Sequence, residues 1–320
     1  MTLNSDGTPM FDLKPYTLSA EERGVKAKLI DKFIVPPFSV LDTRQGYWQD
    51  RKRLWTELGL KSELGRDQTL TYGKTEGNFT SEIIGERGGG ISIFDPVLCE
   101  LLYRWFCPEG GTVLDPFAGG SVRGVVAQVL GRKYTGIDLS KSQIEENINQ
   151  AKSIIPDNMP EWLVGNSENV NELLPKGKSY DMIIGCPPYH DLEKYTDDKE
   201  DLSNVTWTSF KEKYADIIKK CVQKLEWNRF ACFVVSEIRQ DDGYYKGFVP
   251  YTIKSFVDAG MEFYNEMILV NSVGSLSVRI TRQFNSGRKI GRVHQNILVF
   301  YSGDHKNIQK HFKELNFTGA

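Results

Sequence analysis

The sequence predicts an α/β fold with a doubly wound sheet, mostly parallel with an antiparallel last strand, preceded by an N-terminal extension. From about residue 112 onward, short apolar runs alternate with amphipathic stretches, which is the pattern of strands alternating with helices. A glycine-rich stretch follows the first apolar run, and an acidic residue ends the second. No internal repeat of about 20 to 50 residues interrupts this pattern.

The individual elements follow from the period of the apolar residues. Strands are expected at 112–116, 134–138, 161–165, 180–185, 230–237, 263–270 and 296–301. Helices are expected at 95–106, 121–130, 140–153, 207–225 and 248–259. No helix is expected between the last two strands, so the stretch 271–295 is interpreted as a loop that joins an antiparallel pair.

Residues 1–90 are predicted to be an N-terminal extension that packs on a catalytic domain formed by residues 91–320. A helix is expected near 20–33, then the loop-like VPPFSVLDTRQGYW, and then a charged helix. The glycine run at 88–90 marks the predicted boundary.

The composition is that of an ordinary globular protein, with 40% hydrophobic, 12% aromatic and 26% charged residues in 320. No apolar run approaches the roughly 20 residues that cross a bilayer, and the N-terminus lacks the pattern of a secretory signal, so a cytoplasmic location is expected. The five cysteines include no CxxC pair, so we expect neither a disulfide nor a metal site. The net charge of −2 means that any site for a polyanion must be local.

The strongest local pattern is TVLDPFAGGSVRG at 112–124, an apolar strand that runs into a glycine turn and a helix. Gly119 and Gly120 let the backbone approach a ligand closely, although a tight structural turn is an alternative explanation. The next strand ends at Asp138, where a carboxylate binds ribose hydroxyls in nucleoside-binding folds; capping of the helix near Ser140 is the simpler alternative. Asn166, after the third strand, is placed to meet an adenine edge.

The predicted catalytic residues follow the fourth strand, in YDMIIGCPPYH. Pro187 and Pro188 fix φ and remove two amide donors, which leaves a rigid set of carbonyl acceptors. Such carbonyls would orient an exocyclic amine, and Tyr189 would offer a flat face on which a flipped base stacks. Cys186, Pro187, Pro188 and Tyr189 are therefore the catalytic candidates.

The motifs DPFAGG, GIDLS and CPPY, in this order and at strand ends, resemble the amino-methyltransferases of DNA, which modify adenine N6 or cytosine N4. The resemblance covers about residues 91–302, and the long N-terminal extension is similar to that of phage-encoded methylases. It implies a class I, Rossmann-like methyltransferase fold, S-adenosylmethionine as cofactor and DNA as partner. The cofactor residues that it implies are Phe94, Asp115, Phe117, Gly119 and Asp138.

One position departs from the family motif, which has Asp, Asn or Ser before Pro-Pro-aromatic. Sulfur is a poorer hydrogen-bond acceptor than oxygen, so the carbonyl of Pro187 would carry more of the amine's orientation, helped by Asp191. A nucleophilic role for Cys186 in cytosine carbon-5 methylation is a rival interpretation. Methylation of RNA or of a protein side-chain amide, and a degenerate module that binds cofactor or DNA without chemistry, also remain open.

The segment 273–295 carries five basic residues and no acid, and long loops in compact domains tend to be functional. It is interpreted as a DNA-contacting element, with a solvated basic hairpin as the alternative. The residues concerned are Arg279, Arg282, Arg288, Lys289 and Arg292. The stretch RQGYWQDRKRLW at 44–55 interleaves basic and aromatic residues as nucleic acid favours, or is a helix whose tryptophans face the core. The acidic run Asp197–Asp201 is interpreted as a solvated loop.

Overall fold

The computed structural model describes residues 33, 35–60, 94–189, 201–240, 242–273 and 276–315. The expected helix near 20–33, the glycine run at 88–90 and Asp191 lie outside these residues, apart from Phe33. In the acidic run 197–201, only the last residue, Asp201, is among the described residues.

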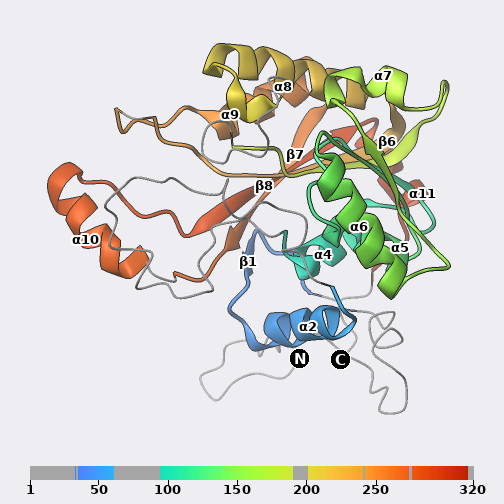
Figure 1. Ribbon diagram of the computed structural model, residues 1–320, viewed down its shortest axis with the longest axis horizontal. Helices are drawn as coiled ribbons and strands as arrows, with labels where there is room; N and C mark the ends of the chain where they lie inside the picture. The colour runs from blue at the N-terminus through green and yellow to red at the C-terminus, as the bar shows by residue number, and fades with distance from the viewer. Residues whose placement is uncertain are drawn as a thin grey trace.

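Among the described residues, eight strands form one sheet in the order β1-β7-β8-β6-β5-β2-β3-β4 (Figure 1). The strands are β1 Val40–Asp42, β2 Thr112–Asp115, β3 Lys133–Asp138, β4 Glu161–Val164, β5 Tyr180–Gly185, β6 Leu225–Val235, β7 Glu262–Val270 and β8 His294–Ser302. Every pairing is parallel except those of β8, which runs antiparallel to both β6 and β7. The predicted mostly parallel sheet with an antiparallel last strand is confirmed.

Helices cover both faces of the sheet, as Figure 1 shows. On one face lie α2 Gly46–Glu57, α4 Pro96–Phe106, α5 Val122–Val129 and α6 Lys141–Ile154, and on the other α7 Val170–Leu173, α8 Trp207–Val222 and α9 Phe248–Asp258. Because strand side chains alternate, Met182 and Ile184 of β5 enter the first core, and Ile183 between them enters the second. The five helices expected after residue 94 are all present.

Capping residues fix where several of these helices begin. Asp95 accepts hydrogen bonds from the amides of Val97 and Leu98, and Pro96 occupies the first turn of α4. Ser140 caps α6 and Thr206 caps α8 in the same way. These side chains satisfy amides that have no partner inside the helix, which is why the predicted starts agree with the structure.

The order of the strands creates a switch point between β2 and β5. From β2 the chain moves outward to β3 and β4, and then returns to place β5 on the other side of β2. The connections leaving the carboxyl ends of β2 and β5 therefore diverge, and a crevice opens at that edge of the sheet, where open α/β sheets bind ligands.

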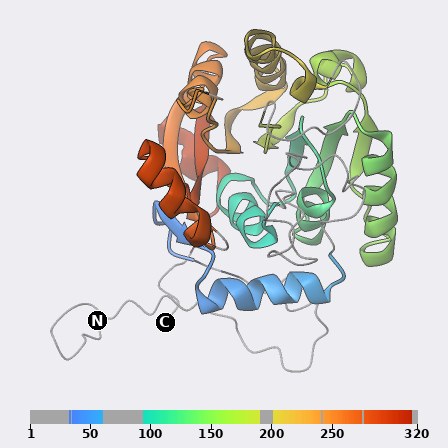
Figure 2. The same cartoon turned by 60° about the vertical axis from the view of Figure 1, so that its left-hand side comes forward.

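Helix α2 belongs to the same hydrophobic core as α4. Figure 2 shows α2 below α4. Trp48 and Trp55 are buried, and the buried Arg51 makes two hydrogen bonds to Glu100, of 2.7 and 2.8 Å. The stretch RQGYWQDRKRLW had two interpretations, a nucleic-acid-binding segment and a helix whose tryptophans face the core. The buried tryptophans agree with the second. The short strand β1 precedes it and extends the sheet beside β7.

The expected loop at 271–295 is wrong in one respect, because it contains helix α10, Leu276–Gly287. Apolar residues at 276, 280 and 284 recur every four positions, which is a helical stripe. Leu276 and Ile280 of this stripe pack on Gly291 in the segment that returns to β8, where an added Cβ would lie 2.8 Å from Leu276. The helix therefore stands beside the sheet, at the left of Figure 1. A last short helix, α11 Ile308–His311, follows β8.

Across the residues that the structure describes, none of the helices combines the length and the apolar character needed to span a membrane.

Candidate active site

The turn after β2 is held by a buried ion pair. Asp115 accepts hydrogen bonds from Nε of Arg123 at 2.5 Å, from the hydroxyl of Tyr134 at 2.7 Å and from the amide of Phe117 at 3.0 Å. Arg123 also donates to the carbonyls of Phe117 and Ala118. Asp115 has no exposed surface, so this carboxylate shapes the turn from behind and does not reach the crevice.

The charges of this ion pair are stabilised where they are buried. Burial alone would lower the pKa of Arg123, but the charge of Asp115, the interactions with Tyr134 and Cys186 and the hydrogen bond to Asp115 together outweigh it and raise that pKa above its ordinary value. Burial, together with the same negative charge, raises the pKa of Tyr134, which keeps its hydroxyl protonated as a donor. Both partners of Asp115 therefore hold their donor protons at neutral pH.

The glycine turn and the acid of the next strand are directly bonded. Oδ2 of Asp138 accepts the amide of Gly119 at 2.8 Å, and Oδ1 accepts the amide of Ser140 at 2.8 Å. Gly119 has φ +51°, a left-handed conformation that favours glycine. Gly120 follows it without a positive φ. Asp138 is half-buried, and since a carboxylate oxygen accepts two hydrogen bonds, these amides do not exclude a ribose hydroxyl.

Asn166 lies beyond β4, at the same edge of the sheet. Its side chain accepts the amide of Glu168 at 2.9 Å, and the neighbouring Ser167 donates to the carbonyl of Pro116 at 2.6 Å. The turns after β2 and β4 are thus joined, while the amide of Gly165 binds the carbonyl of Asp138. Asp138, Gly119 and Asn166 therefore occupy neighbouring strand ends, as the sequence predicts.

The proline corner, residues 186–189, follows the end of β5, and β5 lies beside β2 in the sheet. Gly185, before it, approaches Phe233 so closely that an added Cβ would lie 2.7 Å from that ring. Cys186 is half-buried, and Tyr189 is 7% exposed. The hydroxyl of Tyr189 accepts Nε2 of Gln295 at 3.0 Å, and its ring meets Phe248 edge-on at 6.2 Å. In this conformation the ring that was expected to stack on a base is largely covered.

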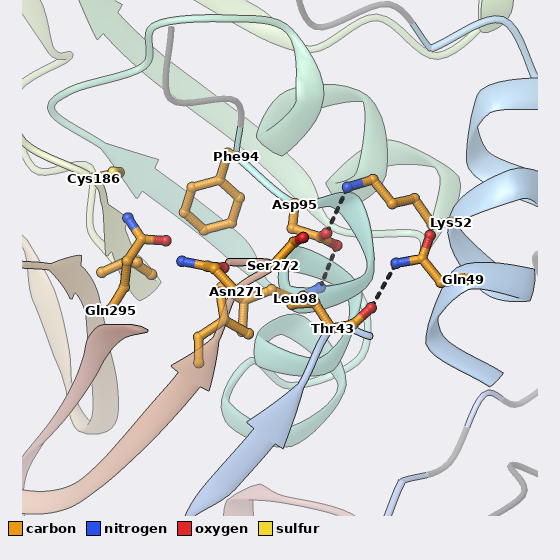
Figure 3. Close-up of a pocket in the computed structure, with 12 residues that line it drawn as sticks. Thr43, Gln49, Lys52, Phe94, Asp95, Leu98, Cys186, Asn271, Ser272 and Gln295 are labelled. Carbon is orange, nitrogen blue, oxygen red and sulfur yellow. Dashed lines mark hydrogen bonds and ion pairs between the residues drawn. The ribbon is translucent and has the colours of Figure 1, made fainter. Parts of the chain in front are cut away.

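A polar cavity of about 230 Å³ lies beside Cys186 (Figure 3). The lining residues come from seven elements or their ends: Thr43, Gln49, Lys52, Phe94, Asp95, Leu98, Cys186, Val234, Leu269, Asn271, Ser272 and Gln295. Lys52 binds Asp95 at 3.0 Å on one side, and Cys186 and Gln295 form the opposite side. The side-chain amide of Asn271 lies between these two sides of the cavity and points toward Gln295 in Figure 3.

Phe94 links this cavity to the glycine turn. Its ring lines the cavity, and the guanidinium of Arg123, which braces the turn, lies 4.6 Å from the ring centroid. Phe94 therefore contacts, through Arg123, the carbonyls of Phe117 and Ala118 in the turn. Phe117 turns the other way, with its ring packed against Tyr214 and Phe233.

Sequence reasoning placed Lys52 in a basic stretch and did not single out the other polar lining residues, which are Thr43, Gln49, Asp95, Asn271, Ser272 and Gln295. Asp95 had a signal, since Asp-Pro is a typical helix start. Asn271 and Gln295 had none, because their proximity depends on the register that places Leu269 opposite Gln295 between β7 and β8.

The basic residues near the C-terminus are divided between α10 and the segment after it. Arg282 is exposed, while Arg288 has φ +52° and lies 5.1 Å from the ring of Phe284. Lys289 is half-buried, and Arg292 is bound to the carbonyl of His294 and to Oδ1 of Asn296. Arg279 lies on α10, but its side chain is not described. These cations are therefore not equivalent: Arg282 faces solvent, and Arg292 is held at the base of β8.

Residues 95–150 match the family of N6 and N4 methyltransferases described as DNA methylase. This confirms the predicted resemblance over α4, the glycine turn, β3 and most of α6. The proline corner at 186–189 lies outside the matched residues. A search of curated protein sequences found no significant match.

Among solved structures, the chain is similar to TrmN from Thermus thermophilus, with 14% identity and a TM-score of 0.44, over 65% of this chain and 49% of that one. A methyltransferase from Pyrococcus furiosus matches with 13% identity and a TM-score of 0.45, over 80% and 98% of the two chains. The magnesium protoporphyrin IX methyltransferase from Synechocystis, with bound SAH, matches with 13% identity and a TM-score of 0.40, over 60% and 74%.

Proposed function

We propose that this protein is an S-adenosylmethionine-dependent DNA methyltransferase that modifies an exocyclic amine, adenine N6 or cytosine N4, of a flipped base. The observation that carries the proposal is the meeting of two features at the switch point of the sheet. The Gly119–Asp138 unit lies at the ends of β2 and β3, and the corner at Cys186 leaves β5 on the other side of β2. The DNA methylase match over residues 95–150 supports the same reaction class.

The cofactor would lie over the ends of β2, β3 and β4. Asp138 would accept the ribose hydroxyls, the backbone at Gly119 and Gly120 would approach the ligand closely, and Asn166 would meet the adenine edge. Phe94 would lie against the methionine end of the cofactor. Asp115 and Phe117 would act from behind, by fixing the turn. When bound, S-adenosylmethionine supplies a methyl group on a positively charged sulfur, which is already an activated donor.

The protein's part in the reaction is positioning. The carbonyl of Pro187 would accept an N–H of the target amine and turn the nitrogen lone pair toward the methyl group. Held in this way, the nitrogen would be placed to take up the methyl group that the cofactor supplies, and the methylated amine would then release its extra proton to solvent. Because the proton leaves after transfer, no general base is required.

The cavity beside Cys186 is the place that we assign to the target base. It borders the proline corner, and amide side chains of Asn271 and Gln295 line it, which pair with base edges through their donor and acceptor atoms. The cations Arg279, Arg282, Arg288, Lys289 and Arg292 would contact the DNA backbone.

The coverage of Tyr189 favours one alternative, a module that binds cofactor or DNA without chemistry. With 7% of its surface exposed and its edge on Phe248, the ring must be uncovered before a base can stack on it. In the catalytic proposal, the target base displaces these contacts.

The test incubates the protein with tritiated cofactor and unmethylated duplex DNA, then digests the DNA and weighs the nucleosides. N6-methyladenine or N4-methylcytosine is the expected product. Incorporation into RNA or protein alone would mean that the substrate is not DNA. Measured cofactor binding without any incorporation would favour the module that binds without chemistry.

One variant of Cys186 separates amine chemistry from a cysteine nucleophile. Cys186→Ser keeps the size of the side chain and supplies a better acceptor, so amine methylation should persist. Loss of activity in this variant, together with 5-methylcytosine as the product of the unmodified protein, would establish the nucleophilic reaction instead.

A further inference from the structure

A small hairpin connects β6 to α9. Arg239 and Tyr245 pair as an antiparallel bridge, the amide of Gln240 binds the carbonyl of Tyr244 at 2.8 Å, and Gly243 takes the left-handed φ of +91° that closes the turn. Nη1 of Arg239 binds the carbonyl of Gly243 at 2.7 Å. The hairpin is therefore held by its own backbone and by one arginine.

The base of the hairpin is fixed to the start of α9. The carboxylate of Glu237 accepts the amides of Gly247 at 3.1 Å and Val249 at 2.7 Å. Phe248, between these two residues, is the ring that meets Tyr189. One ring contact thus separates the hairpin's anchor from the proline corner.

The hairpin presents aromatic rings to solvent. Tyr244 is 74% exposed and Tyr245 is 46% exposed. The guanidinium of Arg239 lies 4.1 Å from the ring centroid of Tyr245, and Nζ of Lys246 lies 5.5 Å from that of Trp207. Exposed rings beside cations are the arrangement by which proteins stack on bases and bind the phosphates next to them.

The hairpin touches the segment that follows α10. A Cβ added at Gly243 would lie 2.9 Å from both Cε and Nζ of Lys289, so this lysine rests on the turn. The residue before Lys289 in the chain, Arg288, lies against the ring of Phe284, which is 44% exposed. Both segments extend to the left of the sheet in Figure 1, and α10 comes to the front in Figure 2.

The charge of this combined surface favours a polyanion. Residues 276–292 contain no acid, Arg282 and Arg288 of this stretch are exposed, and the hairpin adds Arg239 and Lys246. The hairpin also carries Asp241, which is not described, and Asp242, whose carboxylate accepts the amide of Tyr244 at 3.0 Å. The carboxylate of Asp242 is thus used within the turn, and the cations outnumber the acids.

We infer that the hairpin Arg239–Lys246 is a second DNA-binding element, which forms one surface with α10 and stacks Tyr244 on a base of the DNA near the extruded one. The inference rests on the proposed function and names a contact that it does not contain. A ring at the tip of a rigid turn is suited to this, because extrusion leaves a neighbouring base without its stacking partner.

Photocrosslinking tests the contact directly. The full-length protein is irradiated on duplex DNA in which thymine is replaced by 5-bromouracil, and the crosslinked peptides are identified by mass spectrometry. Crosslinks at Tyr244 or Tyr245 are expected. Crosslinks that map only to other peptides would overturn the inference.

Affinity for the same DNA gives an independent measurement. Tyr244→Ala should weaken binding about 5- to 100-fold, the loss of one stacked base, whereas Tyr244→Phe should retain it. Trp227→Ala is the matched control, because Trp227 is 65% exposed but lies near the start of β6, away from the strand end that leads into the hairpin.

The two hypotheses fail in different ways. If Arg282→Ala weakens DNA binding while Tyr244→Ala and Trp227→Ala both leave it unchanged, the hairpin is not a DNA contact and the proposed function stands. If the unmodified protein binds no DNA, both are overturned.

Discussion

Gly119 donates its backbone N–H to Oδ2 of Asp138 at 2.8 Å, so the glycine turn after β2 and the acid at the end of β3 form one hydrogen-bonded unit. The other carboxylate oxygen accepts the amide of Ser140. The same side chain therefore shapes the turn and fixes Ser140, the residue that caps α6. Asp138 is not itself the helix cap, and its binding of a ribose remains a prediction.

Replacing this acid should weaken cofactor binding. Asp138→Ala is expected to lower the affinity for S-adenosylhomocysteine about 10- to 100-fold, since hydrogen bonds to a charged group contribute about 1.5–3 kcal/mol. Isothermal titration calorimetry measures it. Glu145→Ala, which removes an exposed carboxylate of α6, is the control, and equal affinities of the two variants would remove Asp138 from the site.

The Gln295–Tyr189 hydrogen bond should affect transfer and not cofactor affinity. Tyr189→Phe removes only this bond and should slow methyl transfer about fivefold, whereas Gln295→Ala also removes an amide from the cavity and should slow it at least as much. The double variant should then be no slower than Gln295→Ala. Single-turnover rates on DNA test this. Additive effects would mean that the two side chains act independently.

The exposed arginine of α10 should contribute to the salt dependence of DNA binding. Arg282→Ala is expected to weaken binding and to reduce the slope of log K against log salt by about 0.9, the contribution of one phosphate contact. Fluorescence anisotropy over a salt series measures the slope. Lys254→Ala, an exposed lysine of α9, should leave it unchanged; the same slope for Arg282→Ala would place Arg282 outside the interface.

The contact between α2 and α4 should be important for stability. Glu100 has no exposed surface and accepts hydrogen bonds from Arg51, Trp55 and Arg104. Glu100→Ala removes the carboxylate that is paired with the buried Arg51 and should lower the free energy of unfolding by about 3–5 kcal/mol. Arg53→Ala breaks an exposed pair with Asp50 and should cost less than about 1 kcal/mol. Urea unfolding compares them, and equal losses would contradict the assignment.

Asp181 should make stability depend on pH in the acid range. Burial alone would raise its pKa, but hydrogen bonds from Thr112 at 2.9 and 3.0 Å and from Arg229 at 2.8 Å lower it below the ordinary value. A depressed folded-state pKa contributes stability that is present above the unfolded value, about 3.9, and is lost as the pH falls through the folded value.

The corresponding measurement is the free energy of unfolding between about pH 5 and pH 3. The unmodified protein should lose stability more steeply over this range than Asp181→Asn, which has no carboxylate to protonate. Asp258→Asn, at an exposed pair on α9, should follow the unmodified protein. Parallel curves for all three would show that Asp181 does not contribute.

The sequence determined the elements that repeat a local pattern. The strands at 112–115 and 180–185 contain the short apolar runs VL and MII, and the start of α4 is marked by Asp95 and Pro96, so each could be predicted from its own residues. Helix α10 was missed although its apolar stripe at 276, 280 and 284 has a helical period, because a polar, basic stretch between two strands was interpreted as a loop; only the structure shows Leu276 and Ile280 packed on the return segment.

Only the tertiary structure decided which side chains meet. Local periodicity fixes where a strand begins and ends, because the backbone bonds and the alternation of side chains act over a few residues. It does not fix that Gln295 reaches Tyr189, that Arg51 is buried against Glu100, or that Lys289 rests on Gly243. Those contacts depend on strand order and register, which are set by the packing of the whole sheet.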